Sequence, residues 1–164
     1  MNLTELLLKE MEGEYPNTRK LLALIPDDKF DWKPHPKSMS MKRLAVHLAE
    51  LPSWPDVILK TSEIDFATMD YKPADVQNTQ ELLDLFDREL EKGRTALAAA
   101  TEDNLLIDTW TMRQGDYIIS TESKYNMIRH AFGQNIHHRA QLGVFLRLLD
   151  IPIPGVYGPS ADEM

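Results

Sequence analysis

Four segments of this chain place apolar residues three and four positions apart, and this spacing constrains the fold more than any other feature of the sequence. On an α-helix it gathers the apolar side chains on one face. The segments span residues 2–24, about 40–60, 80–100 and about 124–149. Because moderate loops join them, the pattern predicts an all-α fold, a four-helix bundle.

Prolines modify two of the expected helices. Pro16 predicts a kink or restart in the first helix, because a proline ring removes a backbone donor and crowds the preceding turn. Ser38 or Ser40 is the expected N-cap of the second helix, and Pro52 and Pro55 must bend or shorten it.

The segments between the helices are of three kinds. Residues 26–39 and 61–77 contain no regular pattern and are expected to be loops. Residues 108–119 alternate between apolar and polar side chains, and Gln114-Gly115 offers a turn, so a small β-hairpin is expected before the last helix. Residues 151–164 are rich in proline and glycine and predict an extended tail.

Length and charge limit the classes of function. The chain has 164 residues, which suits a single domain over residues 1–164. Its net charge of −8 argues against nucleic acid as a partner, because an acidic surface repels phosphates. The absence of cysteine excludes thiolate catalysis and thiolate metal ligands. No apolar run approaches the ~20 residues that span a bilayer, so we expect no membrane partner and a cytoplasmic location.

Three polar residues in apolar surroundings suggest a site for a divalent metal. Gln134 and His138 are four residues apart, which places them one turn apart on the same helix face. His47 lies in the apolar stretch 44–48 of the second helix and could provide a third ligand. Imidazole is the commonest protein ligand for zinc and similar cations. The alternative is that these are ordinary core histidines, each hydrogen-bonded to a neighbour.

Helical phase separates the two adjacent histidines of the last helix. At 100° per residue, His138 falls near the middle of the apolar stripe and His137 at its margin, with Gln134 to one side. His138 is therefore expected to face inward and His137 outward. The stripe is formed by Met127, Ile128, Ala131, Leu142, Phe145, Leu146 and Leu149.

Other polar residues near these positions have simpler interpretations. Arg139 and Gln141 are expected on a solvated helix face or in a hydrogen bond between helices. Glu50 could hold the His47 imidazole, but a surface salt bridge is the preferred interpretation. The three tryptophans, at positions 32, 54 and 110, are expected to be packing residues.

Several stretches of the chain resemble the DinB/YfiT-like family, whose members are small bacterial four-helix bundles with a metal centre. The resemblance covers nearly the whole sequence, and its most specific part is the run from Ile136 to Leu142 combined with the upstream His47. The matching stretches are 25–34, 38–48, 110–116, 136–142, 146–149 and 151–154.

The resemblance implies a ligand set and also shows a departure from it. The ligands of the family would fall at His47, position 134 and His138, but position 134 is glutamine in this chain rather than histidine. An amide oxygen is a harder and weaker ligand than imidazole. Three alternatives follow: a site with two histidines and Gln134, a shift toward His130 or His137, or a site that no longer holds metal well. We favour the first.

The resemblance also implies two kinds of activity. Relatives include metal-dependent thiol S-transferases and proteins regarded as metal-dependent hydrolases, and both would use an open position on the metal. We therefore expect a small-molecule substrate, for example a low-molecular-weight thiol, a zinc or nickel ion, and a homodimer. The alternative is a non-catalytic bundle, a binding or dimerisation module with a degenerate metal site.

Overall fold

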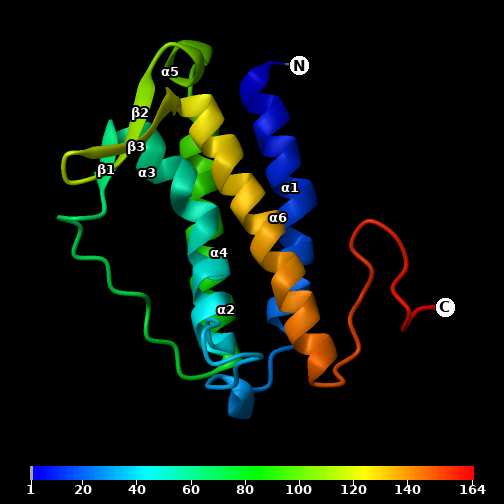
Figure 1. Ribbon diagram of the computed structural model, residues 1–164. Coiled ribbons are helices and arrows are strands. Elements are labelled where there is room, and N and C mark those ends of the chain that lie inside the picture. Colours follow the sequence, from blue (N-terminus) through cyan, green and yellow to red (C-terminus); the bar gives the residue numbers. More distant parts are fainter. Residues whose placement is uncertain (1) are drawn as a thin grey trace.

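Four long helices lie side by side in the computed structural model, which describes residues 2–164 (Figure 1). They are α1 (Leu3–Leu22), α2 (Met41–Glu50), α4 (Thr79–Ala98) and α6 (Lys124–Leu148). Helices α4 and α6 each pack against both α1 and α2, so the four enclose a common apolar core. The prediction of a mostly helical bundle is confirmed.

Helix α1 continues through its internal proline without the restart that we predicted. It begins with a capping box, in which Asn2 and Glu5 exchange hydrogen bonds with each other's backbone N–H groups. The Asn17 amide, one residue after Pro16, donates to Gly13 O at 3.2 Å. Tyr15 is fully buried next to the proline, and this packing holds the helix together on both sides of it.

The second helical segment is broken into three parts, as its prolines predicted. Helix α2 starts at the Ser40 cap and ends at Glu50, a 3₁₀ turn η2 (Leu51–Ser53) follows, and α3 (Trp54–Lys60) completes the segment. Pro52 cannot donate a backbone hydrogen bond. The Ser53 hydroxyl donates to Glu50 O at 2.9 Å within this turn. Pro55 lies in the first turn of α3, where a missing N–H costs nothing.

Helix α4 makes a close approach to this turn. A Cβ at Gly93 would lie 1.9 Å from Pro52 O and 3.3 Å from the end of the Met11 side chain. Only glycine therefore allows α4 to lie this close to η2. The helix is capped by Asn78, whose side chain accepts from Glu81 N at 2.9 Å.

The small sheet has three strands and lies beside the bundle (Figure 1). The hairpin is formed by β2 (Thr109–Gln114) and β3 (Tyr117–Ser123), which confirms its prediction, although the turn falls one residue later, at Gly115-Asp116. The third strand, β1 (Glu63–Asp65), pairs parallel with β2. It lies in a segment that we had expected to be irregular throughout.

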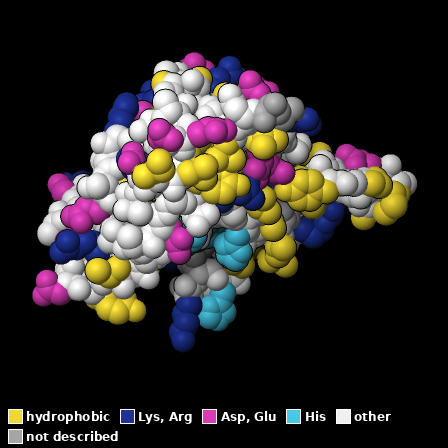
Figure 2. Space-filling model, turned by 90° about the horizontal axis from the view of Figure 1, so that it is seen from above, with side chains coloured by type: hydrophobic (Ala, Val, Ile, Leu, Met, Phe, Trp, Pro, Cys, Tyr) yellow, Lys and Arg dark blue, Asp and Glu magenta, His cyan; other side chains and the backbone are white. Residues whose placement is uncertain are grey.

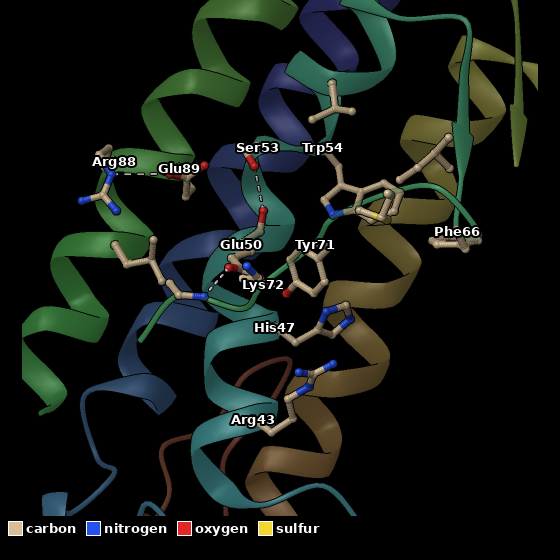
Figure 3. A pocket seen from close by; sticks show the side chains of 15 residues that line it. Arg43, His47, Glu50, Ser53, Trp54, Phe66, Tyr71, Lys72, Arg88 and Glu89 are labelled. Carbon is tan, nitrogen blue, oxygen red and sulfur yellow. Dashed lines mark hydrogen bonds and ion pairs between the residues drawn. The ribbon is translucent and has the colours of Figure 1, made fainter. Parts of the chain in front are cut away.

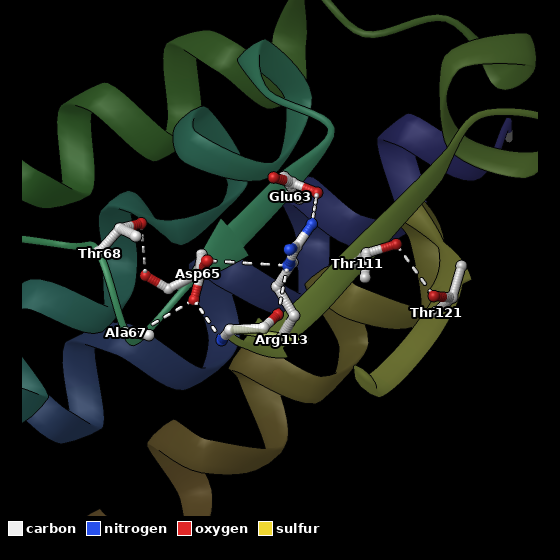
Figure 4. A network of polar contacts seen from close by, with 8 residues as sticks. Glu63, Asp65, Ala67, Thr68, Thr111, Arg113 and Thr121 are labelled. Carbon is white, nitrogen blue, oxygen red and sulfur yellow. Dashed lines mark hydrogen bonds and ion pairs between the residues drawn. The ribbon is translucent and has the colours of Figure 1, made fainter. Parts of the chain in front are cut away.

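A carboxylate ties β1 to the hairpin turn. Asp65 Oδ1 accepts from the backbone N–H groups of Ala67 and Gly115, both at 2.9 Å, and Arg113 forms ion pairs with Asp65 and Glu63 (Figure 4). The two backbone hydrogen bonds hold the pKa of Asp65 below its usual value. These contacts hold a three-residue strand that would otherwise have few partners.

A short helix, α5 (Glu102–Leu106), was not predicted. Thr101 and Asn104 form a capping box at its start, and Leu105 is fully buried. Five residues are too few to show helical periodicity in a sequence.

The interior face of α6 contains two polar residues that the predicted apolar stripe did not include. Arg139 is buried, not solvated, and forms the inter-helix hydrogen bond that was the other expectation. It donates to the backbone and carboxylate of Glu14 on α1, and also to the Tyr157 hydroxyl, at 2.6–2.8 Å. Asn135, one turn earlier, is also buried and accepts from Thr18. These partners come from α1 and the tail, which explains why a buried arginine is tolerated at this position.

The tail after α6 folds back against the bundle. Arg147 forms two hydrogen bonds to the carboxylate of Asp162, which also accepts from the backbone N–H of Ile153. Ile151, Ile153 and Val156 pack against the core. The tail is thus extended, as predicted, and fixed in place.

The surface is mixed in character. Seen from the end that carries the N-terminus, hydrophobic side chains lie among acidic and basic ones, and histidine side chains are visible (Figure 2). Within residues 2–164, no helix combines the length and apolar character needed to cross a bilayer.

The close approach at Gly93 gives a test of the fold. Replacing Gly93 by alanine should lower the free energy of unfolding by roughly 1–3 kcal/mol, because the new methyl group meets the Pro52 backbone. The matched control is Gly13→Ala in α1, where nothing lies within 4 Å. That change should stabilise the protein by roughly 0.5–1 kcal/mol. Urea denaturation followed by circular dichroism measures both, and equal effects would contradict the described packing.

Candidate functional site

Two histidines from facing helices meet at the edge of the core. His47 on α2 and His138 on α6 have ring centroids 4.6 Å apart and ring planes inclined by 85°. Both side chains are half-buried. The structure therefore brings together two of the three residues that the sequence singled out. His138 lies at the margin of the buried stripe, not near its middle, because Asn135 and Arg139 occupy the interior face of α6.

A glutamine orients the His138 imidazole. The Nδ1 atom of His138 lies 2.9 Å from Gln141 Oε1, which can only accept, so Nδ1 carries the proton and Nε2 keeps its lone pair. The amide nitrogen of Gln141 lies 3.2 Å from Nε2 of His137. His137 is exposed, as predicted. The inter-helix hydrogen bond considered for Gln141 is not observed, because its partners lie one turn earlier on the same helix.

Gln134 lies one turn before His138 and is half-buried. Its amide nitrogen contacts Nε2 of the exposed His130 at 3.3 Å, which directs the amide nitrogen along α6. Within residues 2–164, no three His, Cys, Asp or Glu side chains are grouped closely enough to hold a metal ion.

The environment keeps both imidazoles neutral at physiological pH. Burial, together with the neighbouring His138 and Arg43, lowers the pKa of His47 to about 4. Burial also lowers the pKa of His138, and His137 adds to this, although the Gln141 hydrogen bond acts in the opposite direction. Neutral imidazoles offer lone pairs, which is the state that metal ligands and general bases need.

His47 borders a cavity of about 610 Å³ beside α2 and α3 (Figure 3). Arg43, His47 and Glu50 of α2 line it, since residues three or four apart share one face of a helix. The rest of the wall comes from η2, α3, β1, α4 and the chain after β1. Apolar lining is provided by Trp54, Val57, Ile64, Phe66, Met69 and Leu85.

Glu50 holds the long connection between β1 and α4 against the bundle. We call residues 66–77 the strap. One oxygen of Glu50 accepts from the Tyr71 hydroxyl in a short hydrogen bond, and the other accepts from Ala74 N at 3.1 Å. Burial and the Glu50 hydrogen bond raise the pKa of Tyr71. Glu50 therefore fixes the strap, and neither role considered from the sequence, a surface salt bridge or a contact with His47, is observed.

Three residues of the site were missed from the sequence, and one of them left a usable signal. Arg43 lies four residues before His47, the same spacing that linked Gln134 to His138. Tyr71 lies in the strap, where no periodicity marks it. Gln141 was noticed, but its role as the partner of His138 was not predicted.

The tryptophans largely pack as expected. Trp110 is fully buried and donates to Thr61 Oγ1 at 2.8 Å. Trp32 packs edge-on against Phe145 of α6. Trp54 packs against Trp110 and also forms part of the cavity wall.

The fold and sequence together identify the family. The sequence pattern of the DinB family matches residues 1–164, and the chain belongs to that family. No curated protein matches the sequence.

Solved structures of DinB-like proteins share the fold. A DinB-like protein from Bacillus subtilis has a TM-score of 0.71 and 19% identity, over 92% of this chain and 97% of that one. A DinB-like protein from Bacillus cereus has a TM-score of 0.70 and 21% identity, over 93% and 97%. A DinB-family structure from Exiguobacterium sibiricum has a TM-score of 0.68 and 22% identity, over 100% and 99%. At these identities the likeness concerns the fold alone.

The lowered pKa of His47 predicts a pH-dependent stability. The unfolded chain binds a proton at His47 near the ordinary pKa of 6.5, and the folded chain only near 4. Between these values the unfolded state holds more protons, so the free energy of unfolding should fall as the pH drops from 6.5 to 4. His138, whose pKa is also lowered, acts in the same direction.

Urea denaturation at a series of pH values, with a chelator present, measures this dependence. His47→Asn should flatten the profile between pH 6.5 and 4. The control His35→Asn changes an exposed imidazole and should keep the wild-type profile. An unchanged slope in His47→Asn would contradict the described environment of His47.

Proposed function

We propose that the chain is a divalent-metal-dependent enzyme acting on a small molecule, of the thiol S-transferase or hydrolase kind. The observation that carries this proposal is the perpendicular pair of neutral imidazoles, His47 and His138, beside a cavity of about 610 Å³. Zinc lies about 2.0–2.1 Å from a ligating imidazole nitrogen, so two rings with centroids 4.6 Å apart are close enough to share one cation.

The residues present fit such a cation with an incomplete protein shell. His138 has Nε2 free because Gln141 occupies Nδ1. Gln134 is the third donor we propose, through its amide oxygen, since its nitrogen faces His130. Two imidazoles and one amide would bind zinc or nickel less tightly than three imidazoles.

The division of roles follows from this arrangement. His47, Gln134 and His138 would hold the ion, and Gln141 would fix the orientation of the His138 ring. A bound divalent cation would lower the pKa of a thiol or water molecule in an open position. The apolar walls contributed by Trp54 and Phe66 would hold the body of the substrate and exclude water from it.

A second candidate is a non-catalytic binding or dimerisation module. The observation that favours it is Gln134 itself, because a neutral amide stands where a third strong ligand would complete the site. Homodimerisation fits either function and stays a prediction.

Calorimetric titration of tag-free protein with zinc, repeated with nickel, separates the candidates. We expect measurable binding by the wild type, loss of it in His47→Ala and in His138→Ala, and retention in the control His137→Ala. Gln134→His should tighten binding by about tenfold or more, which corresponds to about 1.4 kcal/mol, because imidazole replaces an amide. Gln141→Ala should weaken it by roughly 10–100-fold, as expected for a residue that orients a ligand.

The outcomes are distinct. No binding by the wild type but binding by Gln134→His would support the degenerate site. No binding by either protein, or loss of binding in His137→Ala but not in His138→Ala, would reject a metal site at this histidine pair.

A further inference from the structure

One cation in the cavity has no carboxylate to balance it. Within residues 2–164, the guanidinium of Arg43 forms no ion pair and no side-chain hydrogen bond. It lies one helical turn before His47, and Figure 3 shows both side chains extending from α2 to the same side. An unpaired guanidinium presents donors in a planar fork that matches an oxyanion.

The other two cations of the cavity wall are already paired. Arg88 lies 3.5 Å from Glu89, and Lys72 lies 3.8 Å from Asp70. Glu50 could have balanced Arg43, but its two oxygens accept from Tyr71 and from the backbone of Ala74. The hydrogen-bond donors of the Arg43 guanidinium are therefore left unused in the cavity wall, although the net charge of the protein is −8.

The opposite part of the cavity is apolar. Trp54 and Val57 come from α3, and Phe66 and Met69 from the strap. Phe66 and Met69 are substantially exposed, at 42% and 39%. Apolar side chains that line a hollow and remain open to solvent favour an apolar ligand that covers them.

We infer that this cavity binds a small amphipathic oxyanion, with its anionic group on Arg43 beside His47 and its apolar body against Trp54 and Phe66. This inference names the substrate class of the same site and so rests on the proposed function. It also explains how an acidic protein can select an anion, since the Arg43 guanidinium offers donors that no group of the described residues uses. A carboxylate is the simplest such group, because it can pair with the guanidinium through two hydrogen bonds.

The test uses three probes of the same shape and different charge on metal-free protein. They are 4-phenylbutyrate, 4-phenylbutan-1-ol and 4-phenylbutylammonium, and calorimetry measures their dissociation constants. The wild type should bind the carboxylate about tenfold more tightly than the alcohol, as one charge-assisted hydrogen-bond pair at a partly solvated site provides. The ammonium compound should bind most weakly.

Two variants test separately the role of the charged part and the role of the apolar part of the cavity in binding the probes. Arg43→Gln should remove the preference for the carboxylate over the alcohol. Phe66→Ala should weaken both probes by a similar factor and leave their ratio unchanged. The control Arg94→Gln removes an exposed arginine of α4 that lies outside the cavity and pairs with Glu91, and it should bind as the wild type does. Each substituted residue is exposed, so all three variants should fold.

Equal affinities for the carboxylate and the alcohol in the wild type would overturn the inference, as would an unchanged ratio in Arg43→Gln. Because metal is absent, the result is independent of the metal site. Zinc binding without carboxylate preference rejects the ligand class and leaves the metal proposal standing. Carboxylate preference without zinc binding rejects the metal proposal and leaves the ligand class standing.

Discussion

The turn between α2 and α3, and its close contact with α4, determines how the candidate site is built. Pro52 cannot continue the helix, and its carbonyl occupies the space that a side chain at position 93 would need. The chain therefore changes direction at Leu51–Ser53, wedged against Gly93. Helix α2 presents Arg43 and His47 on one side of this turn, and α3 presents Trp54 on the other. The polar and apolar parts of the cavity thus depend on one break in a helix.

Packing of α2 against α6 then brings the two imidazoles together. Burial lowers the pKa of both rings; the neighbouring His138 adds to the effect on His47, and His137 adds to the effect on His138. Gln141 fixes one proton on His138 and leaves the other nitrogen unprotonated. The arrangement keeps one lone pair available on each imidazole next to a cavity. Such lone pairs suit metal binding whether or not Gln134 acts as a third ligand.

The features that the sequence predicted well are those set by local pattern. The four long helices, the proline break, the hairpin, and the exposure of His137 relative to His138 all follow from periodicity or turn chemistry. Helical phase placed His138 too centrally, because polar Asn135 and Arg139 were not expected in the interior.

The features that could not be predicted from the sequence depend on contacts between residues that are far apart in the chain. Strand β1 has three residues, and its partner β2 begins 46 positions after β1 begins. Arg139 can be buried because its guanidinium forms an ion pair with the carboxylate of Glu14, which lies 125 residues away in the sequence. Glu50 fixes the strap by accepting hydrogen bonds from Tyr71 and Ala74, and no pattern in the sequence marks either residue. Arg43 is a candidate binding residue only because no carboxylate of the described residues forms an ion pair with it. This absence can be established only when the positions of the surrounding acidic side chains are known.

The central claim is that His47 and His138 together hold a divalent ion, and a crystal structure of zinc-soaked protein with anomalous scattering data tests it most directly. The account predicts an anomalous peak within about 2.0–2.1 Å of one nitrogen of each ring, on Nε2 in the case of His138. A peak bound instead to His130 or His137, or no peak at the pair while zinc is present in solution, would contradict the account.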